Sequence, residues 1–185
     1  MTDRQPIRRY GAMAQGLHWV IAALIVTQFV LASMADDLPI GMHKLALLAR
    51  HKSVGMTVLM LAVIRLAWRL FHKPPALPSA MKNYEVALAK ITHVLFYVLL
   101  FAVPVTGWLM SSAKGYTVSW FNLFSWPNLI PKDEAAFKIL RSRHEMVATI
   151  LFWVAILHIL AALKHHFVNK DDVLKRMLPY TKTGK

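Results

Sequence analysis

Four long apolar stretches constrain the fold of this chain more than any other feature. They occupy residues 17–35, 53–71, 91–113 and 137–167, and the most apolar part of the last is 145–163. A helix of about 20 apolar residues crosses the ~30 Å hydrocarbon core of a bilayer. The chain has 185 residues, 57% of them hydrophobic, so four such helices leave too little polar sequence for a separate soluble domain. The sequence therefore predicts one all-α domain over residues 1–185, an up-and-down bundle of four transmembrane helices in the lipid bilayer.

The formal net charge of +13 comes from Lys and Arg residues that lie mostly between and beyond these stretches. Membrane proteins place cations there, against lipid headgroups and in excess on the cytoplasmic side. The excess falls on the side that holds residues 1–16, 65–90 and the tail from 164, so both termini are predicted in the cytoplasm. No basic motif interleaved with aromatic residues is present, which argues against a nucleic-acid partner.

The first apolar stretch has an alternative interpretation as a cleaved signal peptide. Arg8 and Arg9 would supply its basic start, and Ser33 and Ala35 its small residues before a cleavage point. The stretch is longer than the ~7–15 apolar residues of a typical signal peptide, so a retained helix is the favoured interpretation.

The absence of cysteine narrows the possible chemistry. It excludes disulfides, thiolate-bound haem, all-cysteine iron–sulfur clusters and covalent haem attachment. Any haem bound here must therefore be held by His or Met ligands and by packing.

Histidines at the edges of the apolar stretches are the most informative polar residues, because such groups at membrane depth usually face the bundle interior and serve a function. His144 and His158 lie fourteen residues apart on the fourth predicted helix. Fourteen residues make nearly four helical turns and rise about 21 Å. The two side chains therefore leave one face of the helix, one near each side of the membrane, as two stacked haems would require.

Each of these histidines has a partner at matching depth in an up-and-down bundle. His18 begins the first helix and is level with His158, whereas His51 begins the second helix and is level with His144. Two bis-histidine pairs predict two b-type haems, with iron bound by all four residues. The alternative for a histidine at a helix end is an interfacial or hydrogen-bonded role. A zinc site fits less well, because neither a His-x-x-x-His nor a His-Glu-x-x-His pattern occurs.

Arg65 lies inside the second apolar stretch and needs an anionic partner. A haem propionate would suit it, because a guanidinium binds a carboxylate through two hydrogen bonds. The alternative is that Arg65 extends toward the cytoplasmic headgroups, which is the favoured interpretation for Arg69.

Short segments along nearly the whole chain resemble the bacterial cytochrome b561 family. They are residues 16–19 (GLHW), 51–55 (HKSVG), 63–66 (VIRL), 92–93 (TH), 103–107 (VPVTG), 144–145 (HE), 157–158 (LH), 165–166 (HH) and 174–179 (LKRMLP). The resemblance implies a four-helix di-haem protein of the bacterial inner membrane. It also implies the axial pairs His18/His158 and His51/His144, the same pairs that the topology predicts.

The activity implied by this resemblance is superoxide oxidation, with electrons passing inward through the haems to ubiquinone. The predicted outer face carries cations that would attract superoxide, although Asp36 and Asp37 share that face. Residues near His18 and His158 are candidate quinone contacts. For two of these candidates, His165 and His166, the alternative is a helix end that faces the lipid headgroups. The outer cations are Lys44, Arg50, Lys52, Arg141 and Arg143, and the candidate quinone contacts are Lys90, His93, Tyr97, His165 and His166.

Two other functions remain open from the sequence. The chain would serve as a cytochrome subunit that links a periplasmic dehydrogenase to the quinone pool if residues 120–131 dock such a redox partner. A haem-free transporter or channel would instead be colourless.

Overall fold

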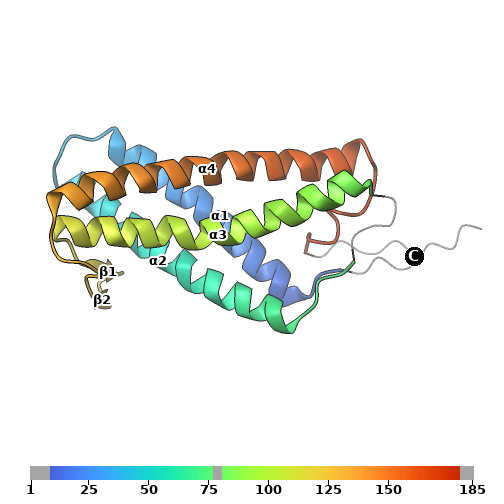
Figure 1. The fold of residues 1–185 in the computed structure, drawn as a ribbon, viewed down its shortest axis with the longest axis horizontal. Coiled ribbons are helices and arrows are strands. Elements are labelled where there is room, and N and C mark those ends of the chain that lie inside the picture. The colour runs from blue at the N-terminus through green and yellow to red at the C-terminus, as the bar shows by residue number, and fades with distance from the viewer. Residues whose placement is uncertain (1–8, 77–80, 180–185) are drawn as a thin grey trace, which may run out of the picture.

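The structure is a computed structural model that describes residues 9–76 and 81–179. Four helices run side by side: α1 (Ala12–Asp36), α2 (Met42–Phe71), α3 (Asn83–Lys114) and α4 (Glu134–Phe167) (Figure 1). Each is long and apolar enough to cross a membrane, which confirms the predicted four-helix class. Some cations used above lie outside the described residues. They are Arg8, considered as part of a signal peptide, and Arg4, Lys182 and Lys185, which belong to the terminal segments predicted in the cytoplasm.

Helix α2 extends well beyond the apolar stretch that marks it in the sequence. The stretch begins at Ser53, but the helix begins at Met42, so the segment expected to connect two helices forms its first turns. Residues 42–52 include Ala, Leu, Lys and Arg, which are good helix formers. Hydropathy locates the part of a helix that lies in lipid, whereas helix propensity decides where the helix itself starts.

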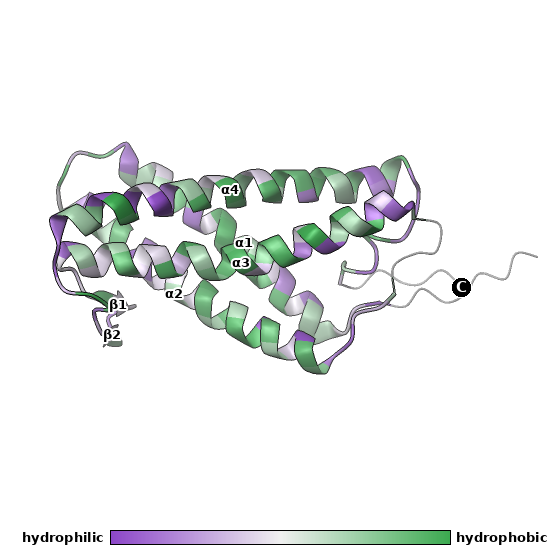
Figure 2. Cartoon of the chain, in the orientation of Figure 1, coloured by the Kyte–Doolittle hydropathy of each residue, from purple (hydrophilic) through white to green (hydrophobic). Residues whose placement is uncertain are grey.

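The bundle is built from two helical hairpins. α1 packs along α2, α3 packs along α4, and α2 contacts α3. A small core of Ile21, Val58, Ala62 and Leu100 joins α1, α2 and α3. Most other large apolar side chains remain exposed along the helices, and polar residues gather toward the ends (Figure 2). This is the pattern expected when lipid, rather than protein, covers the outer surface.

We call the end of the bundle that holds the start of α1 and the end of α4 the inner end. The segment after α4 folds back there, and its main-chain carbonyls accept hydrogen bonds from α1. Gln15 Nε2 donates to Arg176 O at 3.1 Å, and Trp19 Nε1 donates to Met177 O at 2.8 Å. The two ends of the described chain therefore meet on one side of the bundle.

The opposite, outer end carries a small hairpin of β1 (Val118–Trp120) and β2 (Phe124–Trp126). Phe121 and Asn122 turn the chain with φ of 48° and 61°. Ser53 of α2 fixes this turn, because its hydroxyl donates to Ser119 O and accepts from Phe121 N–H. Trp120 Nε1 also donates to Thr57 Oγ1, so the hairpin lies against the side of α2.

Candidate functional site

Near the inner end, His18 of α1 and His158 of α4 face each other across the bundle. Their ring centroids are 6.3 Å apart, and the ring planes cross at 67°. Two residues of α3 complete the surroundings of His158: the His93 ring lies 6.1 Å away and the Phe96 ring 5.2 Å away. The structure therefore brings together the two residues predicted as one pair and adds His93 as a third imidazole at the same level.

Near the outer end, His51 of α2 and His144 of α4 form a second pair. Their ring centroids are also 6.3 Å apart, with the planes at 86°. The pairing across helices is the one expected from the sequence.

This separation suits two imidazoles that bind one metal ion from opposite sides. An imidazole nitrogen lies about 2 Å from a bound first-row metal and about 1 Å from the centre of its own ring, so two such rings are separated by ~6 Å. Rings in direct van der Waals contact would be closer when stacked. The donor set of each pair, two neutral nitrogens and no thiolate, suits a six-coordinate b-type haem.

The main chains of α1 and α4 are separated by side chains. Although side chains of the two helices meet, no Cα of α1 lies within 8 Å of a Cα of α4. Between the two histidine levels, Phe29 and Phe152 make an edge-to-face contact with centroids 5.4 Å apart. This aromatic pair separates the inner site from the outer one, and no motif in the sequence marks it.

His144 is held in a fixed orientation by α3. Its Nδ1 lies 3.0 Å from Val103 O and 3.3 Å from Thr106 Oγ1, so Nδ1–H donates to the carbonyl and Nε2 is left free to bind a metal. A Cβ added at Gly107 would lie only 3.0 Å from His144 Cε1. The 103–107 segment of α3 therefore positions this imidazole, through the Val103 carbonyl and the missing side chain of Gly107.

Two adjoining cavities open at the inner end. One has a volume of about 660 Å³ and is lined by cations that include Arg9, Arg65, Arg69 and Lys73. The other, of about 650 Å³, is lined by Lys90, His93 and Tyr97. The structure thus brings three of the predicted quinone contacts to one cavity and places Arg65 in the cavity beside it. Tyr10 lines both cavities and was not anticipated, since nothing in the sequence marks the segment before α1 as part of a site.

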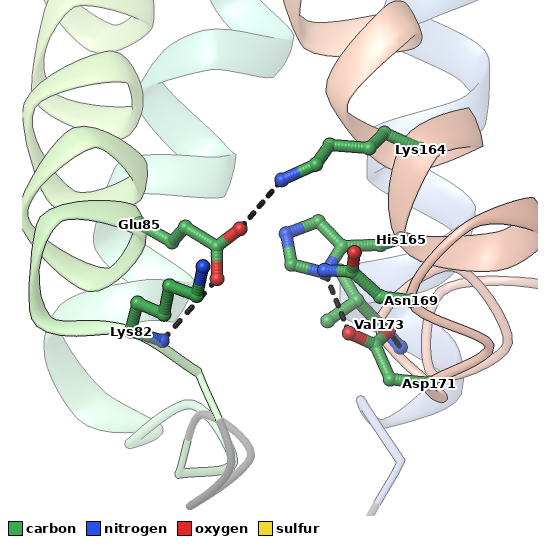
Figure 3. Close-up of polar contacts among 7 residues, drawn as sticks. All are labelled: Lys82, Glu85, Lys164, His165, Asn169, Asp171 and Val173. Atoms are coloured by element: carbon green, nitrogen blue, oxygen red, sulfur yellow. Dashed lines mark hydrogen bonds and ion pairs between the residues drawn. The ribbon is translucent and has the colours of Figure 1, made fainter.

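The two other predicted quinone contacts lie elsewhere. His165 is only 8% exposed, and its Nδ1 contacts Asp171 Oδ2 at 2.5 Å and Asn169 Nδ2 at 3.2 Å. Figure 3 shows this cluster beside the Lys164–Glu85 ion pair, which joins α4 to α3 at 2.6 Å. His166 packs its ring against Phe167. Neither histidine lines the two cavities, and His165 instead ties the end of α4 to the segment that follows it.

The predicted outer cations are spread over several partners. Lys52 is half-buried next to His51 in the chain, where its Nζ donates to Ser111 Oγ at 3.2 Å and lies 5.4 Å from the Tyr116 ring centre. Lys44 donates to Leu38 O, and Arg141 pairs with Glu145. Arg50 and Arg143 are exposed. Lys52 therefore lies next to His51 in the chain, with its ammonium group held by Ser111 of α3 and by Tyr116.

The chain resembles known proteins over almost its whole length. A sequence profile of the family described as prokaryotic cytochrome b561 matches residues 9–180. Cytochrome b561 homolog 2 of Escherichia coli (strain K12) is 36% identical over 174 residues, which cover 92% of this chain and 91% of that protein. A probable superoxide oxidase CybB of Yersinia pestis is 28% identical over 176 residues, covering 93% and 97% of the two chains. Cytochrome b561 homolog 1 of Escherichia coli (strain K12) is 25% identical over 177 residues, covering 95% and 100%.

Proposed function

Because this chain belongs to the prokaryotic cytochrome b561 family, which binds haem b and transfers electrons in bacterial membranes, we propose that it carries electrons through two haems from superoxide to ubiquinone. His18 and His158 would bind the inner haem iron, and His51 and His144 the outer one. The bound haems supply one-electron redox chemistry, while the protein orients them and tunes their potentials. The protein would lie in the inner membrane with both termini in the cytoplasm.

The observation that carries this proposal is the repetition of one geometry. Two histidine pairs, each contributed by two different helices, have the same 6.3 Å ring separation. His93 also lies 6.1 Å from His158, so the argument rests on the repetition of the pair at both levels of α4 and not on one distance. One pair at this distance could be chance, but two on a common helix support a pair of stacked haems.

At the outer end, Lys52 supports a small anionic donor. Lys52 follows His51 in the chain and its ammonium group is partly buried against Ser111, and a cation in such a place attracts an anion more strongly than one in open solvent. Two superoxide anions would each lose one electron and leave as dioxygen. The name of the Yersinia relative, probable superoxide oxidase, is consistent with this donor.

At the inner end, the cavity lined by Lys90, His93 and Tyr97 supports quinone reduction. His93 lies 6.1 Å from His158, centroid to centroid, so this cavity adjoins the inner histidine pair. Reduction of ubiquinone to the quinol needs two electrons and two protons. Side chains of Lys, His and Tyr are groups that hydrogen-bond a quinone carbonyl and relay protons to it.

The direct test is a reduced-minus-oxidised visible spectrum of the detergent-purified protein, with a pyridine haemochrome assay for haem per chain. We expect two b-type haems, and ubiquinone reduction driven by a superoxide source that is abolished by superoxide dismutase. A colourless protein after haem-sufficient expression would contradict the whole proposal. Two haems without superoxide-driven reduction would contradict only the donor.

One observation favours a second candidate, a membrane cytochrome subunit for a periplasmic redox enzyme. The tip of the outer hairpin exposes Phe121 and Leu123, at 51% and 73% of their surfaces. Such a tip would suit a protein partner. Co-purification of a soluble dehydrogenase from the native membrane, lost in Phe121→Ser, would favour this role over superoxide oxidation.

A further inference from the structure

The two histidines of the outer pair differ in what supports them. His144 donates from Nδ1 to Val103 O, whereas His51 Nδ1 is buried with no hydrogen-bond partner among the described residues. Buried polar atoms without partners are rare, and a histidine that binds a metal usually donates its second nitrogen to an acceptor. The environment of His51 should therefore contain an acceptor for this N–H.

Gln28 of α1 supplies a complementary group. Its Oε1 is also buried without a partner in the described part of the chain, although an amide oxygen accepts up to two hydrogen bonds. The main-chain carbonyl of Gln28 is a second acceptor within reach of the His51 ring, although its geometry does not make it a hydrogen-bond partner of Nδ1. An unpaired donor on α2 and an unpaired acceptor on α1 thus belong to two helices that pack together.

Gly55 makes space for this amide. It follows His51 by one helical turn, so the two residues lie on the same face of α2. A Cβ at Gly55 would lie 2.8 Å from Gln28 Nε2, closer than any real side chain allows. The missing side chain lets the Gln28 amide lie directly next to the His51 position.

We propose that Gln28 is a positioning residue for the outer haem: its Oε1 accepts a hydrogen bond from His51 Nδ1–H while His51 Nε2 is the metal ligand. This inference rests on the proposed function, since it assumes a haem between His51 and His144. In this arrangement Gln28 does for His51 what Val103 O does for His144. The bond fixes the tautomer of His51 and makes it a more basic ligand.

The electronic consequence has a definite sign. A more basic ligand stabilises ferric over ferrous iron, so the hydrogen bond lowers the reduction potential of the outer haem. Loss of the acceptor should raise that potential and leave the inner haem unchanged, because Gln28 follows His18 by ten residues, about 15 Å along α1. For a one-electron couple, a tenfold change in the balance between the two oxidation states is about 59 mV.

The test is a redox titration of the purified holoprotein and two variants, with haem per chain measured in each. Gln28→Met keeps the length of the side chain but removes the acceptor, and we expect a rise of about tenfold in the equilibrium constant for reducing the outer haem. Gln28→Glu keeps an acceptor in either protonation state, so its potential should stay at or below that of the natural protein. Thr27→Val, a neighbouring lipid-facing change on α1, is the matched control and should shift neither haem. A His18→Ala background, which removes the inner haem, assigns the outer component.

The possible outcomes separate this inference from the proposed function. If the outer potential is the same in the natural protein and Gln28→Met, the acceptor is a main-chain carbonyl and the inference is wrong, while the haem assignment stands. The same holds if Gln28→Met and Gln28→Glu shift the potential in the same upward direction. If the natural protein contains no outer haem, the proposed function itself fails. If Gln28→Met does not accumulate, the outer-haem potential of Gln28→Glu is compared with that of Thr27→Val. A potential that is raised in Gln28→Glu but not in Thr27→Val overturns the inference.

Discussion

The inner and outer ends of this bundle place their histidines at the same ring separation but support them in different ways. The outer pair lies in a packed region, where α3 holds His144 through Val103 O and Gly107, and a β-hairpin is fixed to α2 by Ser53. The inner pair lies close to His93, which lines one of two cavities that open at this end. The comparison teaches that one ring separation can be held by close packing at the outer end and lie near open cavities at the inner end.

The largest expected effect tests whether the two pairs are separate sites. His18→Ala and His158→Ala should each remove the inner haem, and His51→Ala and His144→Ala the outer haem, because a b-type haem is held only by its ligands and packing. Haem per chain should fall from about two to about one in every case, with two distinct spectra among the four variants. Loss of different haems in His18→Ala and His158→Ala would contradict the pairing.

A smaller effect is expected where packing positions a ligand of the outer pair. Gly107→Val places a branched side chain against His144, whose Cε1 is 3.0 Å from the added Cβ, so the imidazole must move. We expect outer haem affinity to fall roughly 10–100-fold, as when an orienting neighbour of a metal ligand is lost. Haem retention after detergent washing measures it.

Gly16→Ala is the control for this variant, because nothing lies within 4 Å of a Cβ at that position. Equal haem retention in Gly107→Val and Gly16→Ala would show that His144 is not positioned by α3.

The outer pair is tested above by a change in packing. For the inner pair, we expect the reduction potential of its haem to change when a nearby charge is removed. Arg65 lies near enough to both His18 and His158 to act on them electrostatically. Removing its charge in Arg65→Gln should favour the ferric state and lower the inner potential, by about 59 mV for each tenfold change in the redox equilibrium. The same redox titration measures it.

Arg69→Gln is the matched comparison on the same helix, since Arg69 lies over the Tyr97 ring and extends toward solvent. If the inner reduction potential shifts more in Arg69→Gln than in Arg65→Gln, Arg69 and not Arg65 is the cation that acts on the inner haem.

The smallest effect concerns the hairpin that distinguishes the outer end. Ser53→Ala removes a buried hydroxyl, 3% exposed, that accepts from Phe121 N–H. We expect a loss of about 1 kcal/mol in stability, the usual value for one hydrogen bond, with both haem potentials unchanged. Thermal unfolding followed at the haem band measures it. A shift in the outer potential would instead link the hairpin to the redox site.

The sequence by itself determined the class of this protein and the identity of its histidine pairs. Apolar length fixes the number of spanning helices, and in an up-and-down bundle depth along the membrane follows directly from position in the chain. His18 and His158, or His51 and His144, are therefore matched by counting residues. The spacing of His144 and His158 on one helical face needs only the helical repeat.

Only the tertiary structure decided what surrounds those pairs. Hydropathy cannot show how a helix is rotated about its axis, so it could not reveal that Gly55 and Gly107 make room for Gln28 and His144. Nor could it separate His93, which lines a cavity, from His165, which binds Asp171. Depth is a one-dimensional property that the sequence encodes directly, whereas lateral contacts depend on the rotation and packing of all four helices together.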